Sequence, residues 1–247
     1  MKIMSWNILA AEWIKKSYYP TIDKKILFNR RARFTRILKT IKEANADIIL
    51  LQEVMQLEYK SLKQYLYPQY TFSALMPIHW QYSGSNTAEQ NKRTESGNIT
   101  LIKKELFPPD AIKHYSLPFG VYTKTPTLSI FNIHLDDISV KIRNNQIKKI
   151  EELLYSGNKT ILGGDFNQSY RKNSQIYNLP EFTVNNMDCP TYYIEQKMNI
   201  DNIMTRGFRS SSSSSSPSAN TCSIYPTSIE EGFEMYGSDH LPVVTKV

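Results

Sequence analysis

Asp165 and Asn167 are the residues of this sequence whose types and spacing most clearly suggest chemistry. They follow a short apolar run and two glycines, Gly163 and Gly164. At the end of a strand, this arrangement holds a carboxylate and a carboxamide side by side, and the glycines permit close backbone approach or special dihedral angles. The carboxylate can accept a proton from an attacking water while the amide donates to a phosphoryl oxygen. A β-turn is the alternative interpretation.

Glu53 and Asn7 are candidates for holding a metal ion. Glu53 ends the apolar run that starts at Ile48, and a carboxylate there is costly unless it is solvated, paired or bound to a cation. Mg²⁺ prefers one or two carboxylates together with water and phosphate oxygens. Asn7 follows another short strand and carries a neutral amide oxygen that can coordinate Mg²⁺ or orient a ligand. An exposed strand-end charge and a turn-forming asparagine are the ordinary alternatives.

Two histidines lie in similar places. His134 ends an apolar strand, where its imidazole can donate to a phosphate oxygen in the transition state. Asp239 and His240 come directly before the final apolar stretch, so Asp239 can complete the ligands of a cation and His240 can act as a base. Asp201 suits the partner that fixes the tautomer of a histidine. A structural histidine and an Asp–His turn remain alternatives.

These polar residues share one feature, because each lies at the edge of an apolar strand. Every residue alone has an ordinary explanation of comparable weight, but their joint occurrence favours a single metal-dependent site that cleaves phosphoesters. The sequence contains no Walker-type glycine loop, nucleophilic serine elbow or paired-cysteine metal motif that would favour another chemistry.

The hydrophobic pattern predicts an α/β fold. Apolar residues recur at helical spacing in 30–46, 55–66 and 138–154. Strands are expected at 1–6, 47–51, 70–74, 97–103, 127–135, 160–163, 200–205 and 241–247. Helices and strands alternate in the first half, whereas later strands follow one another directly. This mixture favours two packed sheets with outer helices over a purely parallel doubly wound sheet.

The length of 247 residues and the lack of a linker predict one domain over residues 1–247. Residues 77–96 are expected to form a long surface loop. The serine run at 210–216 cannot bury apolar surface, so we expect a disordered loop at 209–220.

The composition limits the cellular location and the kinds of binding partner that we expect. A net charge of +7 favours a polyanionic partner, although surface lysines alone could produce it. Cys189 and Cys222 are too few for a disulfide framework or a zinc cluster. The sequence lacks the apolar run of a membrane-spanning helix and the features of a signal peptide. We therefore expect an intracellular protein, cytoplasmic or nuclear, that is monomeric and binds no membrane.

The motifs in their order resemble those of the endonuclease/exonuclease/phosphatase superfamily, which is related to deoxyribonuclease I and the exonuclease III-like abasic endonucleases. The matching segments span nearly the whole chain and are 5–7, 51–54, 132–135, 164–167, 200–201 and 238–240. The resemblance implies a four-layer α/β sandwich with two packed mixed sheets, whose motif residues meet at one rim.

The resemblance also implies roles for individual residues. Glu53 resembles the main metal ligand, and Asn7 and Asp239 lie near the cation, which is expected to be Mg²⁺, with Mn²⁺ as a substitute. The resemblance implies that His134 contacts the phosphate and that Asp165 and Asn167 position the attacking water. It also implies that His240 and Asp201 form the His–Asp pair of the family. Whether Asp165 or His240 removes the proton from water stays open.

Within the superfamily, segments 6–10 and 51–54 resemble the deadenylase or nocturnin-type branch. This resemblance implies a Mg²⁺-dependent phosphodiesterase acting on RNA or DNA, with exonucleolytic removal of RNA 3′ ends as the leading hypothesis. Asn98 and Arg143 are candidate substrate contacts, and Arg30, Arg31 and Arg33 are candidates for backbone contacts or plain surface charge. Asn98 and Asn202 depart from the usual residue types of the family at their positions, which weakens any inference about substrate preference.

Three alternatives remain. One is a DNA-repair phosphodiesterase, either an abasic endonuclease or an enzyme like tyrosyl-DNA phosphodiesterase. Another is hydrolysis of a small phosphoester. The third is a catalytically dead protein that only binds nucleic acid, but a dead relative would be expected to have lost Glu53, Asp165, Asn167 or His240, and all four are present.

Overall fold

The computed structural model describes residues 1–77, 96–154, 158–169, 174–185, 189–193, 198–208, 226 and 228–247. The expected serine-rich loop at 209–220 lies outside the described residues, as does nearly all of the expected loop at 77–96. None of the described helices combines the length and the apolar character needed to cross a membrane. Cys189 takes part in a disulfide bond, which the expectation of a reducing intracellular setting did not predict.

The described elements alternate early in the chain and cluster as strands later. The α-helices are α1 (Lys24–Leu27), α2 (Arg30–Ala44), α3 (Gln56–Leu66), α4 (Val140–Leu153) and α5 (Ile229–Met235). Short 3₁₀ helices span Ala11–Trp13, Pro109–Ala111 and Gln175–Asn178. The strands are β1 (Lys2–Asn7), β2 (Ile48–Met55), β3 (Tyr70–Phe72), β4 (Met76–Pro77), β5 (Ser96–Lys103), β6 (Lys113–Leu117), β7 (Gly120–Lys124), β8 (Leu128–His134), β9 (Lys159–Asp165), β10 (Phe182–Val184), β11 (Asp201–Arg206) and β12 (Val243–Lys246).

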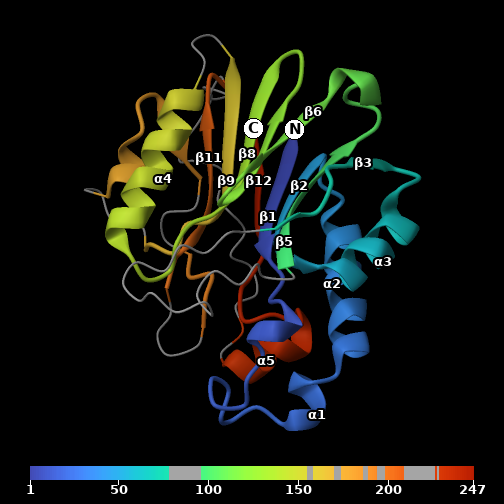
Figure 1. Cartoon of the computed structure of the whole chain (residues 1–247). Coiled ribbons are helices and arrows are strands. Elements are labelled where there is room, and N and C mark those ends of the chain that lie inside the picture. Colours follow the sequence, from blue (N-terminus) through green and yellow to red (C-terminus); the bar gives the residue numbers. More distant parts are fainter. Residues whose placement is uncertain are drawn as a thin grey trace, which may run out of the picture.

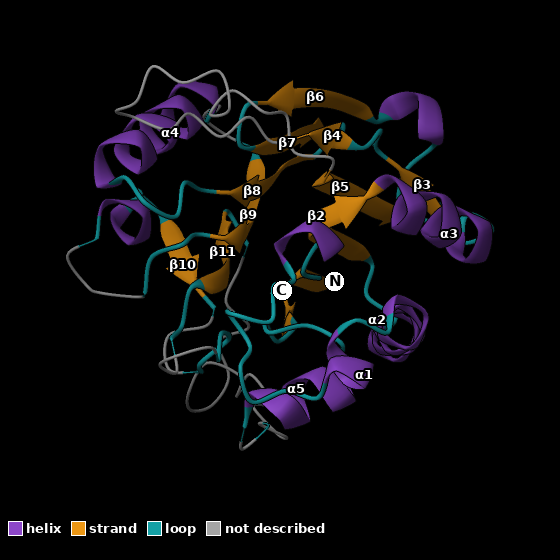
Figure 2. Cartoon of the chain, turned by 60° about the horizontal axis from the view of Figure 1, so that its bottom comes forward, coloured by secondary structure: helices purple, strands orange, loops and turns teal. Residues whose placement is uncertain are grey.

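Two mixed sheets pack face to face and carry helices on their outer sides. One sheet has the order β12-β1-β2-β5-β3, with β4 paired to β5, and the other has the order β10-β11-β9-β8-β7-β6. Viewed from below, α4 covers one sheet while α2 and α3 cover the other (Figure 2). The predicted fold class, a four-layer α/β sandwich, is confirmed.

Three apolar clusters hold these layers together, and β2 shows how its sequence produces two of them. Ile48 and Leu50 face the other sheet and pack with Ile130 and Ile203 between the sheets. The alternate residues of β2 face α2 and α3 in a second cluster. A strand buried on both faces needs a continuous apolar run, which is the pattern at 48–51. A third cluster lies between β8, β9 and α4.

Some elements differ from the sequence expectation. The helix expected at 30–46 ends at Ala44 because Asn45 adopts a left-handed conformation with φ 42°. The β6–β7 hairpin was not predicted, since β6 is largely exposed and has no strong apolar alternation. Helix α5 was not predicted either, because it is short and contains Gly232; buried Phe233 packs its apolar side.

Candidate active site

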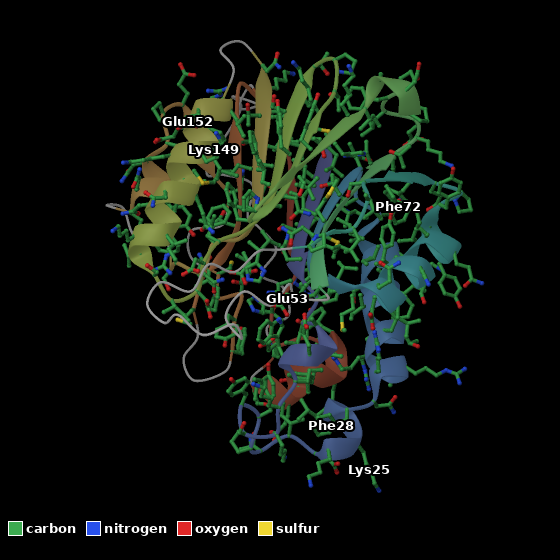
Figure 3. The ribbon with its side chains drawn as sticks, in the orientation of Figure 1. Lys25, Phe28, Glu53, Phe72, Lys149 and Glu152 are labelled. Carbon is green, nitrogen blue, oxygen red and sulfur yellow. The ribbon has the colours of Figure 1, made fainter. Side chains whose placement is uncertain are left out.

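The strand directions bring the predicted polar residues to one edge of the two sheets. Strands β1 and β2 run parallel, and so do β8 and β9, where His134 pairs in register with Asp165. Strand β11 runs antiparallel to β9, so it begins where β9 ends, with Asp201 opposite Asp165. Strand β12 runs antiparallel to β1, which places the preceding residues next to the end of β1. Glu53 lies at this edge, at the lower ends of the strands (Figure 3).

Glu53 is aimed into the site by an irregular backbone. The register of β2 against β5 shifts between Leu51 and Val54, and Glu53 has φ 57°, a region that glutamate rarely adopts. Its carboxylate accepts hydrogen bonds from Asn7 Nδ2 and from the backbone N–H of Ala10, both at 2.8 Å. Burial raises the pKa of Glu53, although these donors and His134 oppose the shift. The chain therefore holds a partly compensated carboxylate in a strained position, which is typical of functional sites.

Gly164 makes the approach to Asp165 possible. Its φ is 151°, and a Cβ atom at this position would lie 1.8 Å from the carbonyl oxygen of Ile133. Only glycine therefore allows β9 to run this close to β8 directly before Asp165. Asn167 also has a positive φ, of 47°; its backbone N–H donates to Asp165 Oδ1 at 2.9 Å, and its side-chain amide donates to the Leu135 carbonyl at 2.8 Å.

Asp165 lies at the centre of the site and is buried. Its Oδ2 accepts a hydrogen bond from Asn7 Nδ2 at 3.1 Å and lies 3.5 Å from Nε2 of His134 and 3.8 Å from Nε2 of His240. Burial and the nearby Asp201 carboxylate raise the pKa of Asp165 to about 7, against the opposing charge of His240. A carboxyl with a pKa near neutrality is well matched to accepting a proton at physiological pH.

His240 and Asp201 form a buried pair. His240 Nδ1 lies 2.8 Å from Asp201 Oδ2, and the hydroxyl oxygen of Thr191 accepts a hydrogen bond from the backbone N–H of Asp201 at 3.0 Å. Burial alone would lower the pKa of His240, but Asp201 and Asp239 outweigh it and raise that pKa well above its usual value. These carboxylates therefore favour the positively charged form of the imidazole. Its ring also contacts that of Tyr192, with 4.7 Å between the centroids.

The residues around Glu53 fit a hard divalent cation. Asp239 is buried, and within the described part of the chain its Oδ1 has no hydrogen-bond partner, a costly arrangement unless a ligand meets this oxygen. The carboxylates of Glu53 and Asp239 supply the oxygen ligands that Mg²⁺ prefers. The predicted metal contact of Asn7 stays a prediction. Its amide oxygen accepts a hydrogen bond from the N–H of Leu9 at 3.0 Å, and its amide nitrogen bridges the carboxylates of Glu53 and Asp165.

A second group of possible metal ligands lies beside the first. Asp165, Asp201 and His240 present ligand atoms that all lie within 4.8 Å of one another. However, the short Asp201–His240 contact already engages the facing atoms of that pair. The oxygen ligands of Glu53 and Asp239 are therefore the better candidates for Mg²⁺.

The candidate substrate contacts are less accessible than the sequence suggested. Asn98 is fully buried and donates to the backbone and side-chain oxygens of Asn132. Arg143 is 8% exposed and donates to the Asp136 carbonyl at 2.6 Å. Arg33, a candidate surface charge, is buried against three carbonyl groups, whereas Arg30 pairs with Glu58 at 2.6 Å. These contacts are all within the protein.

Sequence reasoning missed several residues that support the site. Tyr19 donates to Asp239 Oδ2 at 3.0 Å. Gln52 and Asn132 form a buried amide contact of 2.8 Å that joins the two sheets beneath the site. Gln52 directly precedes Glu53, and Asn132 lies two residues before His134. Their closeness in sequence to predicted site residues could have identified them. Tyr19 has no such neighbour, because its partner is 220 residues away.

The comparisons with known proteins agree with this geometry. Residues 4–240 match the model of the Endonuclease/Exonuclease/phosphatase family, and the chain belongs to this family. Its fold is similar to that of ANGEL2, a 2′,3′-cyclic phosphatase solved with adenosine-2′,3′-vanadate, with a TM-score of 0.65 and 15% identity over 98% of this chain and 94% of that chain. No curated protein sequence matches the chain significantly.

Two further solved structures show the same fold. The human nocturnin catalytic domain aligns with a TM-score of 0.58 and 13% identity, over 99% of this chain and 92% of that chain. Truncated TDP2 from Caenorhabditis elegans aligns with a TM-score of 0.51 and 18% identity, over 83% of each chain. Family membership makes the class of reaction hydrolysis of phosphoester bonds.

Proposed function

We propose that this protein is a Mg²⁺-dependent phosphodiesterase that hydrolyses nucleic-acid phosphodiester bonds, with the 3′ end of RNA as its preferred substrate. The observation that carries the proposal is the meeting of Glu53, Asp165 and the His240–Asp201 pair at one edge of the sheets. These groups supply a cation ligand, a proton acceptor and a fixed positive charge, which phosphodiester hydrolysis needs together.

The side chains have separate tasks in this proposal. Glu53 and Asp239 hold the cation, which when bound neutralises charge on the phosphate and on the leaving oxygen. Asp165 accepts the proton of the attacking water, because its pKa of about 7 suits a base, whereas the carboxylates around His240 favour the protonated form of that imidazole. His240, oriented by Asp201, faces the developing negative charge on the phosphoryl oxygens. His134 lies 3.5 Å from Asp165 and contacts the same phosphate group.

The resemblance of segments 6–10 and 51–54 to the deadenylase or nocturnin-type branch supports an RNA end as the substrate, and two further observations are consistent with it. The chain covers 94% of ANGEL2 and 92% of nocturnin, compared with 83% of TDP2, so its overall layout is closer to the first two. The net charge of +7 suits a polyanion. Removal of 3′-terminal nucleotides, as in deadenylation, is therefore the first candidate activity.

A second candidate is the opening of a 2′,3′-cyclic phosphate at an RNA end. The similarity to ANGEL2, which is described as a 2′,3′-cyclic phosphatase, favours it. The chemistry needs the same residues, because in both reactions water attacks phosphorus and a ribose oxygen leaves. In removal of a 3′-terminal nucleotide this oxygen is the 3′ oxygen of the shortened RNA, and in ring opening it is a 2′ or 3′ oxygen of the terminal ribose.

A substrate panel tests the proposal. Purified protein with Mg²⁺ is given oligo(A) RNA with a 3′-hydroxyl, the same RNA with a 2′,3′-cyclic phosphate, abasic duplex DNA, 5′-tyrosyl DNA and nucleotide phosphoesters. We expect shortening of the first RNA, or ring opening of the second. Preferential cleavage of either DNA substrate or of the nucleotides would reject the RNA assignment. Glu53→Gln, with an expected loss of about a hundredfold or more, controls for contaminating nucleases.

A further inference from the structure

Tyr19 is a buried ionisable residue that the proposed chemistry does not use. Its side chain is 2% exposed, and its hydroxyl donates to Asp239 Oδ2 at 3.0 Å. The other oxygen, Oδ1, is buried and meets no hydrogen-bond donor among the residues that the structure describes. The phenol therefore fixes one oxygen of this carboxylate and leaves the second available.

The ring of Tyr19 is itself held in place. It packs edge-to-face against Phe233 of α5, with centroids 5.2 Å apart and an interplanar angle of 72°. Leu9, Ile22 and Leu27 complete this small apolar cluster. Helices α1 and α5 lie together below the lower ends of the strands (Figure 1). A ring packed on several sides offers its hydroxyl at one position, as a supporting residue must.

Arg33 of α2 fixes the same corner of the protein. Its guanidinium donates to the carbonyls of Ile8 and Leu9, at 3.1 and 2.7 Å, and to the carbonyl of Gly237 at 2.6 Å. The segment after β1 is thereby tied to the segment that leads into Asp239. The backbone next to Asp239 is therefore held by Arg33 as well as by contacts of Tyr19.

We propose that Tyr19 is a positioning residue that orients Asp239 for the divalent cation bound with Glu53. This inference rests on the metal requirement of the proposed function. A carboxylate held at one oxygen loses less freedom when the other binds a cation, and partners of this kind tune metal affinity.

Direct measurement of metal binding tests the inference without relying on turnover. Chelator-treated wild-type protein, Tyr19→Phe and Tyr18→Phe are titrated with Mn²⁺, and free Mn²⁺ is followed by electron paramagnetic resonance. Tyr18 is a matched control because it is the neighbouring tyrosine and is half exposed. We expect about tenfold weaker Mn²⁺ binding for Tyr19→Phe and wild-type binding for Tyr18→Phe. In turnover assays, high Mg²⁺ restores the kcat of Tyr19→Phe.

A double-mutant cycle separates positioning from a general structural effect. If Tyr19 acts through Asp239, the effect of Tyr19→Phe on Mn²⁺ affinity disappears in an Asp239→Ala background. Unchanged affinity in Tyr19→Phe, or an equal loss in that background, overturns the inference. If Tyr19→Phe does not fold, Phe233→Leu, which loosens the ring and keeps the hydroxyl, enters the same cycle. Wild-type protein that binds no Mn²⁺ would instead contradict the proposed function.

Discussion

The two ends of β2 carry acidic residues in opposite situations. Asp47, directly before β2, accepts hydrogen bonds from the N–H of Lys2 at 2.8 Å and from Lys103 Nζ at 3.0 Å. Burial alone would raise the pKa of Asp47, but these donors outweigh it and lower that pKa. At the other end, burial outweighs the donors around Glu53 and raises its pKa. The chain termini lie near the Asp47 end, away from the site (Figure 1).

The difference indicates that the Asp47 end of β2 contributes to stability, whereas the Glu53 end is arranged for chemistry. At the Asp47 end, the carboxylate is only partly buried and accepts from two donors, so its ionised form stabilises the fold. At the Glu53 end, desolvation outweighs the donors to Glu53 and Asp165, and the backbone of Glu53 adopts an unfavourable φ of 57°. Such an arrangement destabilises the protein alone and becomes favourable when a cation or a proton arrives.

The largest expected effect is on turnover. Glu53→Gln keeps the shape of the side chain and removes its charge, so we expect activity to fall about a hundredfold or more, or about 3 kcal/mol of transition-state stabilisation. Asp47→Asn, the matched change at the other end of β2, should leave kcat unchanged. Initial rates on the preferred substrate measure both. Equal losses of activity in Glu53→Gln and Asp47→Asn would contradict the conclusion that only the Glu53 end of β2 takes part in catalysis.

Backbone strain at the site end gives the second prediction. Gly164→Ala should lower the free energy of unfolding by about 2 kcal/mol or more, because its Cβ meets the Ile133 carbonyl. Gly207, at the other end of the same sheet, also has a positive φ, of 78°, but the nearest atom to its Cβ would be 3.4 Å away. Gly207→Ala should therefore cost only about 1 kcal/mol. Denaturant unfolding compares them, and a smaller loss for Gly164→Ala would contradict this account.

The third prediction concerns pH. In the wild type, Asp201 helps to raise the pKa of His240, so the charged imidazole persists to higher pH. Asp201→Asn should lower this pKa, and the alkaline limb of the kcat–pH profile should move to lower pH by about one unit or more. Asp110→Asn, an exposed aspartate, serves as the control. An unmoved limb would show that activity does not need the imidazolium form.

The smallest effect is expected at the Asp47 end. Asp47→Asn should lower the free energy of unfolding at pH 7 by about 1 kcal/mol. Because the folded pKa of Asp47 is lowered, this difference is present above the unfolded pKa of about 3.9 and fades as pH falls through the folded value. Glu105→Gln should change stability by only about 0.3 kcal/mol, because its carboxylate is exposed and lies 3.9 Å from Lys103. Urea unfolding at pH 7 and pH 3 measures both; a constant difference would refute the assignment.

The sequence predicted the fold and the residues gathered at the site because both depend on local patterns. The apolar run at 48–51 predicted the buried strand β2, and the polar residues at strand ends predicted Glu53, His134 and Asp165 as neighbours. In parallel strands, such ends must meet at one edge of a sheet.

The features that the sequence did not predict depend on contacts between residues that are far apart in the chain. The burial of Asn98 follows from its partner on the other sheet, Asn132, which no local pattern reveals. The left-handed conformation of Glu53 follows from the register shift between β2 and β5. Arg143 resembles a surface charge in sequence, yet it is buried against the Asp136 carbonyl because α4 packs closely on the loop after β8.

Metal dependence tests the central claim most directly. Wild-type protein is stripped with a chelator, assayed on the RNA substrate that it prefers, and titrated with Mg²⁺ up to saturation, with Glu53→Gln in parallel. We predict negligible turnover without metal, full recovery in the wild type, and at most about one hundredth of that rate in Glu53→Gln. Equal turnover with and without Mg²⁺ would contradict a cation site built on Glu53 and Asp239.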